Sequence, residues 1–257
     1  MSADQPGPST DSARPSPRPV LYKNPQPLNA ERHKGKSLRA MTNYAFAARA
    51  NSVPMNGNEF PLVMHDYPIV FTPGNPITPV VVMGMRADQN LFVAPNGAWM
   101  EGRYIPAYIR RYPFIFTDLT QQQKLVLSID EDSDLVVADD SRPLFVNDKA
   151  SEVVDHALKF CSEFQAQHNA TVEFAKAVSA RQLLIDQRAE FTISTGERLS
   201  VGPFRVVDET KFNQLPDEIF LDWRRRGWLT LAYSHLASLS NFARLAGLVD
   251  KAAKASS

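Results

Sequence analysis

The chain has 257 residues, which suits one large domain or two small ones and allows well over half of the unfolded chain's surface to be buried. Its 28 basic and 28 acidic side chains balance, which argues against a protein drawn by its overall charge to nucleic acid or to an anionic membrane. No uncharged apolar stretch approaches the length of about eighteen residues that a membrane-spanning helix needs, so we expect no membrane span.

The beginning of the chain, MSADQPGPSTDSARPSPRPV, contains five prolines and lacks both an apolar core and the hydrophobic run of a secretory signal. We interpret residues 1–27 as a disordered tail and expect residues 1–20 to be dispensable for stability. From Lys36 onward the composition is that of a globular domain, and the polar residues 249–257 are expected to fray. These features favour a cytoplasmic protein.

Two stretches repeat one pattern at an offset of 45 positions: EFPLVMHDYPIVF at residues 59–71 and YIPAYIRRYPFIF at residues 104–116. In each copy a proline suits the first turn of a short helix, and a Tyr-Pro pair then ends that helix, because proline pushes the preceding residue toward extended geometry. Apolar runs after each pair predict three strands per copy, the last being NLFVAP in the first copy and DLVVAD in the second.

We predict that the two copies, each a helix plus three strands, pair into one antiparallel sheet of an α+β fold, with residues 28–148 as a strand-rich half. The apolar strand residues expected in its core are Ile69, Phe71, Val80, Val82, Phe114, Phe116, Leu125 and Leu127. In this interpretation the repeat is architecture and carries no binding function.

The alternative is that the repeat holds a ligand through Tyr67, Tyr112, Arg110 or Arg111. A guanidinium group can grip a carboxylate with two parallel hydrogen bonds, so the two arginines would suit an anionic partner at a concave surface. The first copy has no arginine at the equivalent positions and could not make that contact.

Residues 149–248 are predicted to form a helical half that contains one hairpin. Apolar residues at steps of three and four over residues 150–184 predict one helix or two, with a break in phase near Asn169. Cys161 lies on the apolar face, and as the single cysteine it excludes an intramolecular disulfide and indicates a reducing compartment. EFTISTGERLSV predicts a hairpin that turns at Thr195-Gly196, followed by the short strand FRVVD and two further helices.

The stretch SIDEDSDLVVADDS concentrates carboxylates around a predicted strand turn. Asp130, Asp132 and Asp134 occupy the first, third and fifth positions of a calcium loop, but Leu135 stands where the loop needs glycine and Ser141 where it needs glutamate. We therefore expect no metal and keep the three aspartates only as weak candidates for one. A solvated turn, or ion pairs with neighbouring arginines, explains the charges equally well.

The five histidines show no zinc-site spacing, and the chain has no nucleophile elbow, phosphate-binding loop or dinucleotide motif, so no cofactor is expected. His235 lies on a helix predicted to pack in the core, and its alternative role is catalysis together with Asp130 and Asp132. The run DWRRRGW has the charge of a phosphate-binding segment, but a solvated helix end explains it, so no nucleic-acid binding is expected.

Several phrases resemble the pattern of the bacterial SapC family: NEFPLVMHDYPIVF, NLFVAPNGAW, YIPAYIRRYPFIF, LSIDEDSDLV, PLF, VDETKFNQLPDE and AYSHLASLSN. The resemblance runs from about residue 28 to residue 248. The family takes its name from surface-layer genes, and its members are often encoded near flavin-dependent halogenases, cupin-like hydroxylases and outer-membrane receptors. It therefore implies an auxiliary role in modification or uptake. A membrane permease shares the name but must cross the bilayer repeatedly, so it is a different protein.

Together these features predict a SapC-like, non-catalytic accessory protein that binds a protein partner or a small anionic ligand. The alternative is an enzyme whose metal-dependent or acid–base site combines the acidic turn with the arginines, in a cleft between the repeat sheet and the helical half. Convergence of those side chains with His235 in one deep pocket would favour the enzyme, and dispersion would favour binding. The sequence leaves the partner and the oligomeric state open.

Overall fold

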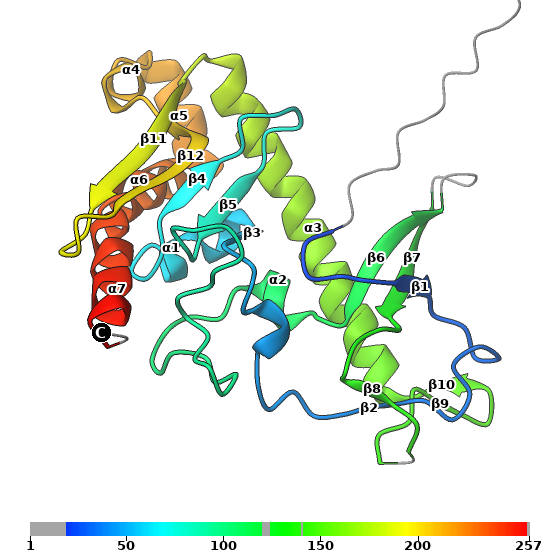
Figure 1. Ribbon diagram of the computed structural model, residues 1–257. Coiled ribbons are helices and arrows are strands. Elements are labelled where there is room, and N and C mark those ends of the chain that lie inside the picture. Colours follow the sequence, from blue (N-terminus) through cyan, green and yellow to red (C-terminus); the bar gives the residue numbers. More distant parts are fainter. Residues whose placement is uncertain (1–18, 120–123, 140, 256–257) are drawn as a thin grey trace, which may run out of the picture.

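One long helix, α3 (Glu152–Ala180), connects a large and a small lobe (Figure 1). The computed structural model describes residues 19–119, 124–139 and 141–255. The helix is continuous, so of the two alternatives that the sequence left open, the single helix is confirmed.

The buried apolar side chains form two clusters, one centred on each lobe, and α3 contributes to both. Val154 and Cys161, near the start of the helix, are buried in the small lobe, whereas Phe174 and Val178, near its end, are buried in the large lobe. Because one rigid helix is anchored in both cores, it fixes the position of one lobe relative to the other.

The large lobe is built on a five-stranded antiparallel sheet with the strand order β11-β12-β4-β5-β3. Its strands are β3 (Ser52–Pro54), β4 (Ile69–Phe71), β5 (Pro79–Val82), β11 (Leu184–Thr192) and β12 (Arg198–Val207). The pairing of Arg205 with Phe71 joins the hairpin of the second half to the strands of the first half. The predicted short strand FRVVD is therefore the end of β12, and this one sheet draws strands from both sides of residue 148.

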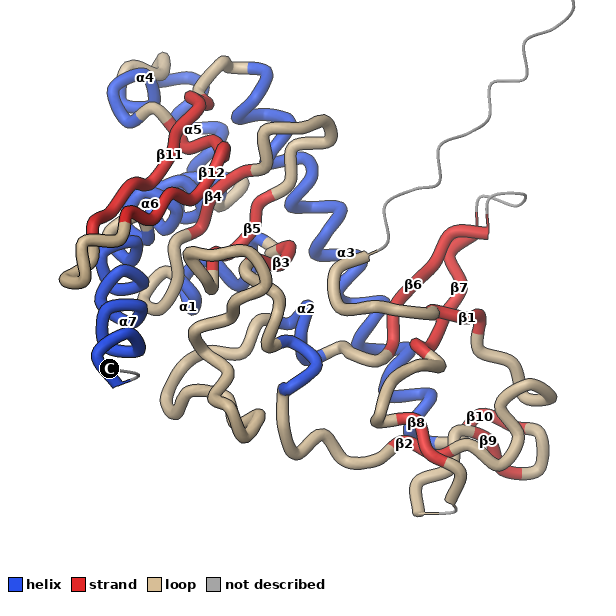
Figure 2. Tube along the Cα trace, viewed as in Figure 1, coloured by secondary structure: helices blue, strands red, loops and turns tan. Residues whose placement is uncertain are grey.

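Helices pack against the large sheet and against one another. They are α1 (Phe60–Val63), α4 (Glu209–Asn213), α5 (Asp217–Arg225), α6 (Trp228–Ser238) and α7 (Asn241–Ala255), with the short 3-10 helices η1 (Ala45–Ala47) and η2 (Gly57–Glu59). Figure 2 shows α6 behind the strands, and Phe204 of β12 stacks on Phe242 of α7 with ring centroids 5.2 Å apart.

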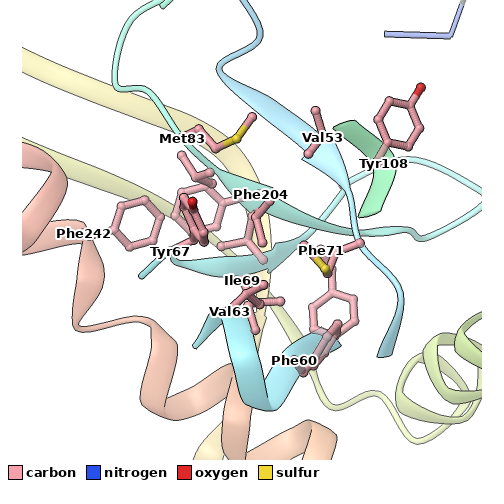
Figure 3. Packing of buried hydrophobic residues seen from close by; sticks show 14 of the residues in the cluster. Val53, Phe60, Val63, Tyr67, Ile69, Phe71, Met83, Tyr108, Phe204 and Phe242 are labelled. Carbon is pink, nitrogen blue, oxygen red and sulfur yellow. The ribbon is translucent and has the colours of Figure 1, made fainter. Parts of the chain in front are cut away.

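Aromatic side chains dominate the core of the large lobe. The fully buried ring of Phe174 lies among Phe60, Phe71, Trp223 and Trp228, with centroid distances of 6.1 to 6.4 Å. Figure 3 shows that Phe60 and Phe71 point into the same interior. Burial of each such ring contributes about 1.5–3 kcal/mol, and edge-to-face contacts add to it.

The small lobe contains a three-stranded sheet with the order β1-β7-β6 and two short strand pairs. The sheet strands are β1 (Pro25–Pro27), β6 (Phe114–Leu119) and β7 (Lys124–Asp130), and the pairs are β2 (Ser37–Leu38) with β8 (Val136–Val137) and β9 (Phe145–Val146) with β10 (Lys149–Ala150). Its core consists of Phe114, Ile129, Leu144, Val154 and Cys161.

Residues 19–27 are part of this fold, although their composition placed them in the predicted tail. Tyr22 is buried and its hydroxyl donates to the Phe114 carbonyl oxygen at 2.7 Å. The N–H groups of Lys23 and Asn24 donate to the Asp130 carboxylate. These long-range contacts stabilise a segment that has little apolar content of its own. Residues 1–18 of the predicted tail lie outside the described residues.

The prediction of one sheet made from the two copies is wrong. Each copy does form a short helix followed by a hairpin, namely α1 with β4 and β5, and α2 (Ala107–Arg110) with β6 and β7. The first hairpin lies in the large sheet and the second in the small one, because β12 and β3 pair with the edges of the first whereas β1 pairs with β7. NLFVAP forms no strand, only a single bridge from Val93 to Trp99.

The expected core residues of the repeat divide accordingly between the two lobes. Ile69, Phe71, Val82 and Phe114 are buried, whereas Val80, Phe116 and Leu127 are partly buried. Leu125 is 46% exposed because the first residues of β7 extend beyond the small core. The broader expectation of an α+β fold with antiparallel sheets is confirmed.

Candidate ligand-binding site

One part of the candidate site comes from the end of α2 and from the Tyr-Pro pair that follows it. Tyr108 and Ile109 of α2 are buried. Arg110 and Arg111 follow them at the C-terminal end of the helix, beside the start of β6. With Tyr112 they line a cavity of about 380 Å³ between α2, α3 and the small lobe. The structure thus brings three of the four predicted ligand-binding residues together at a concave surface.

The cavity combines apolar walls with a positively charged lining. Its apolar residues include Leu38, Phe114, Leu135, Ala157 and Phe160, and its basic residues are Arg39, Arg110, Arg111, Arg142 and His156. No acidic side chain from the described residues lines it, and none of the four arginines forms an ion pair with a described acid. Such an excess of unpaired guanidinium groups favours an anion.

Arg111 is held by aromatic rings instead of by a carboxylate. Its guanidinium carbon lies 4.2 Å from the centroid of Tyr108, 4.3 Å from that of Phe164 and 5.8 Å from that of Tyr22. These cation–π contacts orient the group without neutralising its charge. Its Nε atom is buried and has no hydrogen-bond partner among the described residues, which costs about 1–3 kcal/mol.

Arg110 is exposed but fixed at the edge of the cavity. Its Nε donates to the Ile105 carbonyl oxygen at 3.0 Å, and Nη2 donates to the Tyr104 hydroxyl at 3.1 Å. The guanidinium carbon also lies 5.5 Å from the centroid of Phe160 on α3. Three anchors limit the rotamers of this side chain, so less conformational entropy is lost when it contacts an anion.

Tyr112 contributes a wall of the cavity. Its buried ring stacks on Phe46 with centroids 4.2 Å apart, and its hydroxyl donates to Oδ2 of Asp130 at 3.2 Å. Burial, with a smaller contribution from the negative charge of Asp130, raises the pKa of Tyr112 to about 12. The phenol therefore stays neutral near pH 7, and its hydroxyl already donates a hydrogen bond to Asp130 within the fold.

Comparison with known families adds one finding to this geometry. The SapC family matches residues 28–245, which include the whole lining of the cavity. The chain belongs to the SapC family. No curated protein and no solved structure matches the chain. Among the described helices of this SapC protein, none combines the length and the apolar character needed to cross a membrane.

The structure does not bring the acidic turn of this SapC protein into the cavity. Asp130 is buried, and its carboxylate accepts hydrogen bonds from the N–H groups of Lys23 and Asn24 at 3.0 and 2.7 Å, besides the one from Tyr112. Asp132 and Asp134 are exposed on the turn after β7. No group of three or more potential metal-binding side chains occurs in residues 19–119, 124–139 and 141–255.

The remaining two candidates lie in the core of the large lobe. His235 is fully buried, and both of its ring nitrogens face backbone groups, the N–H of Val207 and the carbonyl oxygen of Ile69. Tyr67 is also buried, and its hydroxyl donates to the Tyr104 carbonyl oxygen. Neither lines the cavity, so His235, the acidic turn and the arginines do not converge in one pocket.

Sequence reasoning did not assign four residues of the SapC cavity to a binding site: Arg39, Arg142, His156 and Phe160. His156 and Phe160 are one helical turn apart and precede Cys161, so a search for partly exposed positions beside the apolar face of α3 would have found them. No local sequence pattern marks Arg39 and Arg142 as residues of a binding site. They meet because β2 pairs with β8 and the N–H of Leu38 donates to the Arg142 carbonyl oxygen at 2.9 Å.

Proposed function

We propose that this SapC protein is a non-catalytic binding protein whose site is the arginine-lined cavity between α2, α3 and the small lobe. The observation that carries the proposal is the presence of four arginines, none paired with a described acid, around a cavity with apolar walls. Carboxylate and phosphate groups match the fork geometry of arginine, and the apolar walls suit a ligand whose anionic group is attached to a hydrophobic body.

The placement of the other polar candidates supports binding over catalysis. Asp130 and His235 are engaged in hydrogen bonds inside the fold, and neither lines the cavity. A general acid or base needs to reach the reacting atoms, at about 2.6–3.2 Å or through one water. The role we propose is that of a cytoplasmic accessory to a modification or uptake system, in keeping with the association of the family with surface-layer and modification genes.

Isothermal titration calorimetry with benzoate and phenyl phosphate tests the proposal. We expect the wild-type chain to bind at least one of them, and the double variant Arg110→Met, Arg111→Met to lose that binding while keeping its melting temperature within a few degrees. Arg225→Met on the exposed side of α5 is the matched control, because it removes one arginine far from the cavity. Retained binding in a folded double variant would refute the assignment of the site.

The same variants test whether the site binds a protein partner. The immobilised wild-type chain should capture its partner from native cells in a salt-dependent manner, because interactions between exposed charges are screened. The double variant should lose this capture, and the Arg225→Met control should retain it. Equal capture by all three chains would remove these arginines from the account of function.

A further inference from the structure

A second cavity, of about 210 Å³, adjoins the first along the same face of α3. Arg110 and Phe160 line both cavities. Along α3, His156 and Phe160 face the first cavity, whereas Phe160, Glu163 and Gln167 face the second, so the contacts advance by successive turns of one helix. The two cavities are therefore neighbours separated by the contact between Arg110 and Phe160.

The second cavity contains a buried carboxyl group that lacks a cation. Glu59 is only 2% exposed, and its Oε1 accepts hydrogen bonds from the Tyr104 hydroxyl at 2.9 Å and from the Ala107 N–H at 2.7 Å. Its Oε2 is buried and has no hydrogen-bond partner among the described residues. Glu59 also forms no ion pair with a described cation, since Arg110 donates to Tyr104 and Ile105 instead.

This arrangement is unfavourable without a ligand. Burial raises the pKa of the Glu59 carboxyl, while the hydrogen bonds from Ala107 and Tyr104, the more distant charge of Arg110 and the backbone N–H of Asn56 act against that shift. A buried carboxylate oxygen gains most from a donor that also carries positive charge. Glu59 contributes to holding the start of α2 through Oε1, but neither that role nor its interaction with the Asn56 backbone gives Oε2 a hydrogen bond of normal geometry.

Several other lining residues of the second cavity also suit a cation, although the guanidinium group of Arg110 stands at its border with the first cavity. Glu163 is exposed and adds a second carboxylate, and the rings of Tyr104, Phe160 and Phe164 surround the space. Aromatic faces attract ammonium groups, and the attraction grows as water is removed. The first cavity presents the opposite charge, so the two neighbouring sites differ in the chemistry that they select.

We propose that the two cavities bind the opposite ends of one zwitterionic ligand, with its carboxylate at Arg111 and its primary ammonium group at Glu59. The proposal deepens the proposed function and rests on it, because the anionic end occupies the site already assigned. On α3, His156 lines the first cavity and Glu163 lines the second. They are seven residues apart, which corresponds to about 10 Å along the helix from one cavity to the other. An extended peptide of about three residues, or an amino acid with a chain of similar length, spans that distance.

Three peptides distinguish the two ends of the ligand in calorimetric titrations of the full-length chain: Ala-Phe-Ala, its N-acetyl derivative and its C-terminal amide. We expect the unblocked peptide to bind and each blocking group to weaken binding by about tenfold or more. Glu59→Gln, which keeps an acceptor for Tyr104 and Ala107, should bind the free and the acetylated peptide alike. Glu101→Gln, at an exposed position outside both cavities, is the matched control.

The outcomes separate this proposal from the one on which it rests. If only the C-terminal amide weakens binding, the anion site stands and the ammonium site is refuted. If neither blocking group matters, or if the unblocked peptide does not bind at millimolar concentration, the zwitterion is refuted, and the titrations with benzoate and phenyl phosphate decide the anion site alone. The comparison of peptides on the wild-type chain gives this answer even if Glu59→Gln does not fold.

Discussion

The buried His235 provides a quantitative test of the fold through the pH dependence of stability. The N–H of Val207 donates to Nε2 at 3.0 Å, and Nδ1 lies 2.8 Å from the Ile69 carbonyl oxygen. These partners require a neutral ring with its proton on Nδ1, because a proton on Nε2 would face the N–H of Val207. Burial lowers the pKa of His235 to about 4, although the hydrogen bond to Ile69 acts in the opposite direction.

The size of the effect follows from the difference between the folded and unfolded states. In the unfolded chain the pKa of histidine is about 6.5, so between pH 6.5 and pH 4 the unfolded state binds the extra proton. The contribution of His235 to the free energy of unfolding is therefore fully present above pH 6.5 and is lost as the pH falls toward 4. The loss is about 2 kcal/mol between pH 7 and pH 5 and about 3 kcal/mol in total.

Urea unfolding followed by tryptophan fluorescence at pH 7 and pH 5 measures this loss. His235→Gln replaces the ring with an amide that can accept from Val207 and donate to Ile69 but does not titrate. Between the two pH values the variant should lose about 2 kcal/mol less than the wild type. Parallel behaviour of His235→Gln and the wild type would refute the assigned environment.

Three further predictions concern the folding of both lobes. Tyr112→Phe removes the hydrogen bond to Asp130 and should lower the free energy of unfolding by about 0.5–1.5 kcal/mol in urea titrations; no change would mean that this bond is weak in solution. Gly84→Ala places a Cβ atom 1.8 Å from a backbone oxygen and should cost about 3 kcal/mol or more, whereas Gly74→Ala meets open space and should be nearly neutral. Deletion of residues 2–18 should leave the melting temperature unchanged, because their composition cannot offset the entropy of ordering; a large fall would contradict this.

The sequence pointed to Arg110 and Arg111 through the difference between the two copies. The equivalent positions in the first copy are His65 and Asp66. Asp66 has a structural role there, since it pairs with Arg103 at 2.8 Å and accepts from the Tyr104 N–H at 2.9 Å. The repeated motif thus holds the segment before α2 in one copy and lines a cavity in the other. Whether the arginines bind a ligand stays a prediction for the titrations to decide.

The other half of the candidate site could not be predicted from local patterns. Arg39 and Arg142 are about a hundred residues apart in the chain and meet through a strand pair of two residues each. Glu59 reads as an ordinary charged residue before a helix, and only the packing of Tyr104 and Ala107 around it reveals a buried carboxyl. Such proximity depends on long-range contacts that leave no periodicity in the sequence.

The sequence by itself determined the elements whose periodicity is local: helical structure along α3, the hairpin that turns at Thr195-Gly196 and the two helix–hairpin units. It also determined the family, because the family's motifs extend along most of the chain. The structure decided that α3 is one continuous helix. Only the tertiary structure decided which strand edges meet, and so placed the two hairpins in different lobes. The physical reason is that strand edges offer the same backbone donors and acceptors whatever their side chains, so the packing of the whole chain selects the partner.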